Sequence, residues 1–101
     1  MTTLNGLNHR AQILFKKRER LAKELHEANL AIIQNRRNAA FITSNRTPEG
    51  RRARKNAIAT AVTFREFEIA EDLFDEYLKE DGASLRFQQS LIKFFHSQLM
   101  K

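Results

Sequence analysis

The chain has no cysteine, and only one proline and three glycines occur among its 101 residues. Without cysteine, a disulfide framework, a thiolate metal site and a cysteine nucleophile are excluded. So little glycine and proline is also atypical of an all-β protein, which needs these residues in its many tight turns. The composition therefore favours few turns and long regular elements.

Long hydrophobic runs are missing as well. The longest, LAII and AAFI, have four residues each, whereas a helix that crosses a bilayer needs about twenty. The N-terminal sequence MTTLNGLNHR lacks the apolar core of a signal peptide. We therefore expect no membrane partner and a location in the cytoplasm of the cell or of a host.

Strong helix formers make up much of the chain. The hydrophobic fraction of 42% and the charged fraction of 30% are those of a folded protein rather than a disordered one. The frequent residues include Ala, Leu, Arg, Lys, Glu and Gln, which all favour helices. A length of 101 residues suits one domain. We predict a single all-α domain over residues 1–101.

Apolar residues recur with alternating spacings of four and three between residues 7 and 42. This is the pattern of a helix that packs against another helix along one seam. It predicts one long helix over about residues 6–43, with Arg18 and Asn35 as the two polar seam residues. The seam consists of Leu7, Ala11, Leu14, Arg18, Leu21, Leu25, Ala28, Ile32, Asn35, Ala39 and Ile42.

A helix start follows the seam at Thr47-Pro48-Glu49. Thr can cap free N–H groups, Pro suits the first helical position, and Glu faces the positive end of the helix dipole. We expect a second helix over about residues 48–80, ended by Gly82. Its apolar residues cover more than half of the circumference, so it should pack against two partners.

A third helix is predicted over about residues 84–100, with Ser84 as its N-cap. The short connection before residue 48 implies that the first two helices are antiparallel neighbours. The predicted fold is thus a long antiparallel helical hairpin, with the shorter third helix packed at its base.

Charge is unevenly distributed in this chain, whose formal net charge is +6. Residues 1–65 carry fourteen Lys or Arg and four Glu, whereas residues 66–101 carry four Lys or Arg and eight Asp or Glu. In the predicted hairpin, the basic residues 10–23 lie beside the acidic residues 66–81. These charges should therefore largely neutralise each other.

The turn of the predicted hairpin has no such counterweight. Seven cations there oppose only Glu49, and six of them are Arg, whose planar guanidinium suits phosphate oxygens and carboxylates. Phe41 is the one aromatic residue nearby, so contact with a nucleic-acid backbone is favoured over base stacking. These residues, named here the basic tip, are Arg36, Arg37, Arg46, Arg51, Arg52, Arg54 and Lys55.

Two protein-binding alternatives stay open. An acidic protein surface would satisfy the basic tip as well as DNA or RNA would. In addition, Leu30, Ile33, Ala40 and Phe41 lie off the seam without predicted cover. We expect this apolar strip to meet a second copy of the chain or another protein, as in an adaptor or inhibitor. A compact basic protein of this kind would suit a phage or mobile element that acts on a host complex.

Catalytic and metal-binding patterns are absent from the sequence. None of His9, His26 and His96 has a second histidine four residues away. No Gly-rich phosphate loop and no nucleophile motif occurs. We therefore expect no enzymatic activity, no metal and no cofactor.

One enzyme family has a loosely similar architecture. The long helix with Arg18 and Arg20, the Thr-Pro-Glu helix start and the short aromatic third helix resemble the all-helical chorismate mutases, which bind a dicarboxylate inside the bundle. The chain departs from that family at residues 27–30, where a basic residue is expected, and in its longer second helix. The resemblance is a remote alternative. The favoured function is a small binding or regulatory protein that contacts a DNA or RNA backbone through the basic tip.

Overall fold

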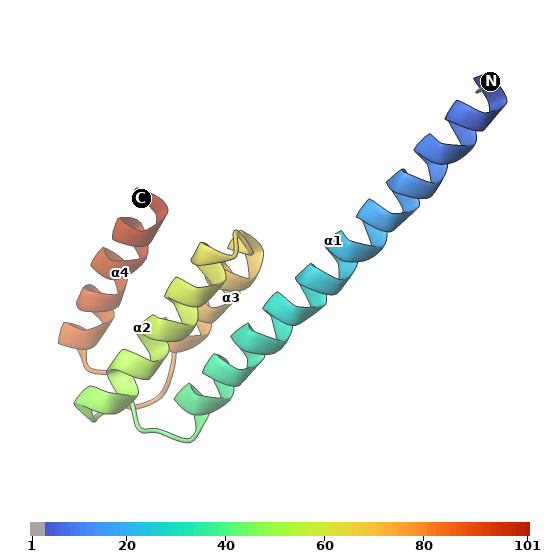
Figure 1. Ribbon diagram of the computed structural model, residues 1–101. Coiled ribbons are helices and arrows are strands. Elements are labelled where there is room, and N and C mark those ends of the chain that lie inside the picture. Colours follow the sequence, from blue (N-terminus) through green and yellow to red (C-terminus); the bar gives the residue numbers. More distant parts are fainter. Residues whose placement is uncertain (1–3) are drawn as a thin grey trace. The chain divides into compact units, whose positions relative to one another are not determined.

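The computed structural model describes residues 4–101, except for the side chains of Leu4, Asn5 and Leu7. Over this range the chain forms four helices and no strand, which confirms the all-α prediction. The prediction for the seam residue Leu7 lies outside the described side chains. The helices are α1 (Leu4–Phe41), α2 (Pro48–Thr63), α3 (Phe67–Leu78) and α4 (Leu85–Leu99) (Figure 1).

The chain divides into two units, which are described separately: residues up to Leu30 and residues 31–101. In the first unit, the described residues belong to a single stretch of α1. The second unit contains the last turns of α1 together with α2, α3 and α4. The prediction of one domain over residues 1–101 therefore stays a prediction.

The core of residues 31–101 lies where α2 packs against both α3 and α4 (Figure 1). Ile58 on α2 and Leu91 on α4 are its largest fully buried side chains, and Leu73 adds a third apolar group from α3. Ile33 and Ala40, in the last turns of α1, are also buried in this core. The end of α1 is therefore held by the same apolar cluster that joins the other three helices.

The start of α2 agrees with the sequence prediction. Thr47 has an extended backbone, and its Oγ1 accepts a hydrogen bond of 3.0 Å from the Gly50 N–H. Pro48 follows at the first helical position. Gly50 is required for a close approach, because a Cβ at this position would lie 1.7 Å from the Ser44 carbonyl oxygen. The loop between α1 and α2 therefore folds tightly against the first turn of α2.

The predicted second helix over residues 48–80 is wrong, because the chain leaves the helix after Thr63. Arg65 has a φ of 60°, in the left-handed region. Its N–H donates to the Val62 carbonyl at 2.9 Å, and the Glu66 N–H donates to the Ala61 carbonyl at 2.9 Å. This pair of bonds is the Schellman motif, which ends a helix by satisfying its last carbonyls. An arginine occupies the position that glycine usually takes.

This break explains why apolar residues covered more than half of the circumference of the predicted helix over residues 48–80. Ile58 and Leu73, which a single helix would present on one side, lie on α2 and α3 and belong to the same core cluster. The chain folds back at residues 64–66, so Glu80, just after α3, returns to Arg54 in the first half of α2. The long hairpin is therefore replaced by α1 followed by three shorter helices.

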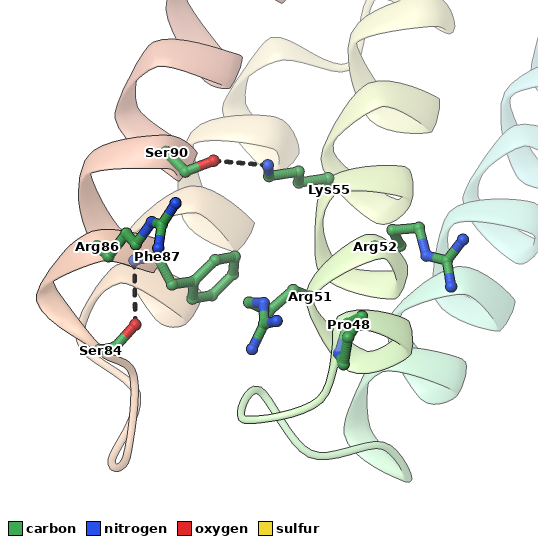
Figure 2. Close-up of a pocket in the computed structure, with 8 residues that line it drawn as sticks. All are labelled: Pro48, Arg51, Arg52, Lys55, Ser84, Arg86, Phe87 and Ser90. Carbon is green, nitrogen blue, oxygen red and sulfur yellow. Dashed lines mark hydrogen bonds between the residues drawn. The ribbon is translucent and has the colours of Figure 1, made fainter.

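The start of α4 is also as predicted. Ser84 is extended, and its Oγ accepts a hydrogen bond of 3.1 Å from the Phe87 N–H. Gly82 does not directly end the preceding helix, since α3 stops at Leu78. It has a φ of 82° in the turn before Ser84, a conformation that glycine adopts without strain. The turn places the first residues of α4 beside the start of α2 (Figure 2).

Candidate anion-binding groove

A groove of about 570 Å³ lies between the first turns of α2 and those of α4 (Figure 2). The two helix starts form its opposite walls, so the fold-back of the chain is what creates it. The residues that line this basic groove are Pro48, Arg51, Arg52, Lys55, Ser84, Arg86, Phe87 and Ser90.

The α2 wall carries three cations at helical spacing. Arg51 and Lys55 are four residues apart and lie on one face of the helix, whereas Arg52 lies at the edge of that face. The Arg51 Nη1 donates a hydrogen bond of 2.9 Å to the Arg46 carbonyl. In Figure 2 the Arg51 side chain lies on the α4 side of α2, and the Arg52 guanidinium extends from the other side of the ribbon. Arg51 is therefore the better placed of the two to meet a ligand in the groove.

Lys55 joins the two walls. Its Nζ donates a hydrogen bond of 2.7 Å to the Ser90 Oγ on α4 (Figure 2). The same ammonium lies 5.7 Å from the centre of the Phe94 ring, where the ring face attracts a cation. These contacts fix the spacing between α2 and α4 at the inner end of the groove and keep a positive charge there.

The α4 wall adds a fourth cation. Phe87 is buried and anchors the first turn of α4, while the Ser84 Oγ caps it. Arg86 projects from the same turn and is exposed. The capped first turn therefore presents Arg86 opposite the cations of α2.

The groove has the electrostatics of an anion site. Among residues 4–101, four cations line it and no carboxylate does. Both α2 and α4 begin at it, and a helix N-terminus carries partial positive charge on its free N–H groups. A ligand with several anionic oxygens could contact cations from both walls at once.

Arg54, by contrast, is a structural residue. It is only 2% exposed. Its Nε donates to Glu80 Oε1 at 2.6 Å and its Nη2 to Glu80 Oε2 at 2.8 Å, so the pair is bidentate. The remaining donors reach the carbonyls of Gly50 at 2.8 Å and Thr43 at 2.9 Å. The prediction that Arg54 belongs to the exposed basic tip is therefore wrong.

The Arg54–Glu80 pair alters its surroundings. The hydrogen bond from Arg54 lowers the pKa of Glu80 below its ordinary value of 4.5. The guanidinium also lies 5.7 Å from the centre of the Tyr77 ring. Burial raises the pKa of Tyr77 to about 12, and its hydroxyl is buried without a hydrogen-bond partner in the described part of the chain.

Arg37 is also taken up by a carboxylate of the same molecule. Its Nη2 lies 2.9 Å from Glu76 Oε1 and its Nε 3.2 Å from Glu76 Oε2. The hydrogen bond to Glu76 raises the pKa of Arg37 above its ordinary value. The sequence had paired these acidic residues with residues 10–23. The fold-back of α3 instead brings Glu76 and Glu80 to two arginines of the basic tip.

The other arginines of the basic tip lie outside the groove. Arg36 is exposed on α1 and lines a separate hollow with Ala31, Ile32 and Asn35. Arg46 is exposed in the loop before α2, with its guanidinium close to Gly82. The structure thus brings Arg51, Arg52 and Lys55 together, and leaves Arg36 and Arg46 as flanking charges.

The predicted apolar strip is not a continuous surface. Ile33 is 3% exposed and Ala40 0%, since both belong to the core, so the expectation that they lack cover is wrong. Leu30 is half-buried, and Phe41 is 86% exposed. The end of α1 belongs to the core cluster of residues 31–101, so Ile33 and Ala40 are covered within the same chain.

Arg86, Ser84 and Ser90 were missed as site residues. The sequence did contain one signal, since Ser84 and Thr47 mark two helix starts that each precede a basic residue in the first turns. Combining the two starts required the fold-back at Arg65, which places α4 beside α2. The site therefore depends on tertiary structure more than on any local motif.

No helix within residues 4–101 is long and apolar enough to cross a membrane. The same range holds no group of three or more acidic or histidine side chains placed to share a metal ion. Comparison with protein families, curated proteins and solved structures finds no match for the chain.

Proposed function

We propose that the protein binds the phosphate backbone of DNA or RNA through the basic groove and acts by binding rather than catalysis. The observation that carries this proposal is the groove itself. Arg51, Arg52, Lys55 and Arg86 line one hollow from two helix starts, and no carboxylate in the described part of the chain shares it. Arg54 and Arg37 are left out of the binding set because Glu80 and Glu76 already hold them.

Phosphate suits this groove better than the acidic surface of a protein. The arginine forks and the free N–H groups of two helix starts can share the oxygens of neighbouring phosphates. Phe87, the aromatic residue of the groove, is buried in the core and offers no surface on which a base could stack. We therefore expect contacts to the backbone, with little dependence on base sequence.

Salt dependence tests the proposal directly. Fluorescence anisotropy would follow the binding of random-sequence DNA and RNA duplexes over a series of salt concentrations. If the groove cations neutralise three or four phosphates, the logarithm of the binding constant should fall with the logarithm of salt concentration with a slope of about −3. Binding that is absent, or insensitive to salt, for both duplexes would contradict backbone recognition.

Single substitutions assign the binding to the groove. Arg51→Ala and Arg86→Ala each remove one cation, from opposite walls, and each should make the salt slope shallower by about 1. Arg65→Ala is the matched control, because Arg65 is an exposed arginine beyond the far end of α2, in a hollow with Lys101. An equal effect of all three changes would show that net charge, and not the groove, determines binding.

A further inference from the structure

An exposed apolar seam runs along residues 8–30. These residues belong to the first unit of the chain, whose described part is a single stretch of α1. The seam residues Leu14, Leu21 and Leu25 are 66%, 51% and 63% exposed. A helix of this length depends on packing of its apolar face more than on helix propensity. The four–three spacing of the seam is that of a helix that packs against another helix almost in parallel or antiparallel.

We propose that this seam pairs with the same seam of a second copy, in an antiparallel arrangement. The proposal is independent of the basic groove, since it concerns other residues. The paired stretch would be roughly 35 Å long at 1.5 Å per residue. Each copy would bury its exposed seam leucines against those of the other.

The charges along the helix favour the antiparallel direction. Residues 8–20 carry five Lys or Arg and one Glu, whereas residues 21–30 carry one Lys and two Glu. In a parallel pair, residues 8–20 of one copy, with a net charge of +4, would lie beside the same residues of the other copy and repel them. An antiparallel pair sets each +4 half beside a −1 half. The same surface is thus complementary to itself in one direction only.

Other apolar surfaces of the chain match this seam less well. α4 exposes Leu85, Ile92 and Leu99 at intervals of seven residues, but Arg86 and Lys93 flank that line and would repel the basic half of the seam. The exposed face of α3 has the opposite sign, with Glu68, Glu71, Asp72 and Asp75. It offers too few apolar groups to cover the leucines. A second copy is therefore the occupant that satisfies both the apolar pattern and the charge.

Sedimentation equilibrium tests the pairing. The wild-type chain should be in a concentration-dependent equilibrium between monomer and dimer. Leu21→Lys should weaken the dimer about 100-fold, because each dimer loses two buried leucines. Ile13→Lys is the matched control, since Ile13 is 53% exposed on the same helix but lies off the seam. A wild-type chain that stays monomeric, or a Leu21→Lys chain that dimerises as well as wild type, would overturn the proposal.

The absence of cysteine makes the direction testable as well. Ala11→Cys and Ala28→Cys each introduce the sole thiol of the chain, near opposite ends of the seam. In an antiparallel dimer, oxidation of a mixture of the two variants should give the mixed disulfide, and neither variant alone should crosslink efficiently. A disulfide between two copies of Ala11→Cys would show that the helices are parallel and would overturn the antiparallel arrangement.

Discussion

Arg54 joins three segments of the chain through a single guanidinium group. It binds the carboxylate that follows α3, the carbonyl of Thr43 in the loop after α1, and the carbonyl of Gly50 in its own helix. Loss of one partner would leave a buried charge without compensation, which typically costs about 3–5 kcal/mol. The residue therefore contributes to the architecture and not to the surface charge.

The pKa of Glu80 leads to a prediction at the same scale. Because Arg54 lowers the pKa of Glu80 below 4.5 in the folded chain, the unfolded chain binds the proton first on acidification. The stabilisation is complete above pH 4.5 and is lost as the pH falls through the folded pKa. Glu80→Gln removes the negative charge but keeps an oxygen that can accept a hydrogen bond from Arg54. It should therefore cost less than complete loss of the partner and reduce the free energy of unfolding by about 2 kcal/mol at pH 7 and by much less at pH 3.

Urea unfolding at several pH values would measure this change. Glu71→Gln, on the exposed face of α3, is the control and should leave the pH dependence near that of the wild type. A Glu80→Gln chain whose free energy of unfolding depends on pH as steeply as that of the wild type would show that the Arg54 contact does not control acid stability.

At the scale of the elements, the break between α2 and α3 sets the course of the chain. Arg65 is the non-glycine residue with positive φ among the described residues, and a side chain in this conformation costs about 1–2 kcal/mol. Glycine removes that strain but makes the unfolded chain more flexible. Arg65→Gly should therefore raise the free energy of unfolding by roughly 0.5–1 kcal/mol.

Chemical denaturation of the wild type, Arg65→Gly and Arg65→Ala distinguishes the effect of backbone strain from that of the lost charge. Arg65→Ala removes the same charge but keeps a Cβ in the left-handed conformation, so it should not show the gain of Arg65→Gly. If both variants are stabilised equally, the gain comes from the lost charge and the backbone argument fails. A loss of stability in Arg65→Gly would mean that the arginine side chain makes a contribution larger than the strain.

The helix starts could be predicted from the sequence because capping is local. Thr47 and Ser84 each precede the first turn that they cap, so a few residues are enough to recognise them. The break at residues 64–66 has no glycine or proline, and Phe64 continues the apolar spacing of Ala57 and Ala61. Tertiary packing of α3 and α4 on α2 decides the conformation of Arg65, and such packing leaves no local signal.

In the candidate site, too, the residues that are close in the sequence could be predicted, and the one brought in by tertiary structure could not. Arg51, Arg52 and Lys55 were predicted because they are close together in the sequence at a helix start. Arg86 is more than thirty residues away from them and reaches the groove only through the fold-back of the chain. The same fold-back neutralises Arg37 and Arg54. The turn at residues 64–66, which was not predicted, thus accounts both for the presence of Arg86 in the groove and for the absence of Arg37 and Arg54 from it.

At the scale of the whole molecule, the two proposals combine into a test of their own. A dimer formed through the seam would carry two basic grooves, so a duplex long enough to reach both should bind more tightly than a short one. The second contact becomes intramolecular and can raise the apparent affinity about 100-fold. A duplex that spans one groove should gain nothing from dimerisation.

Leu21→Lys, which disrupts pairing, should therefore lose the preference for the long duplex and keep the affinity and salt slope of the wild type for the short one. Arg51→Ala should weaken binding to both duplexes, and Ile13→Lys should behave as the wild type does. Anisotropy titrations with the two duplexes, at protein concentrations above the dimer dissociation constant, would measure these differences. If Leu21→Lys gains as much from duplex length as the wild type, the two grooves do not act together, because the longer duplex then offers only more independent sites.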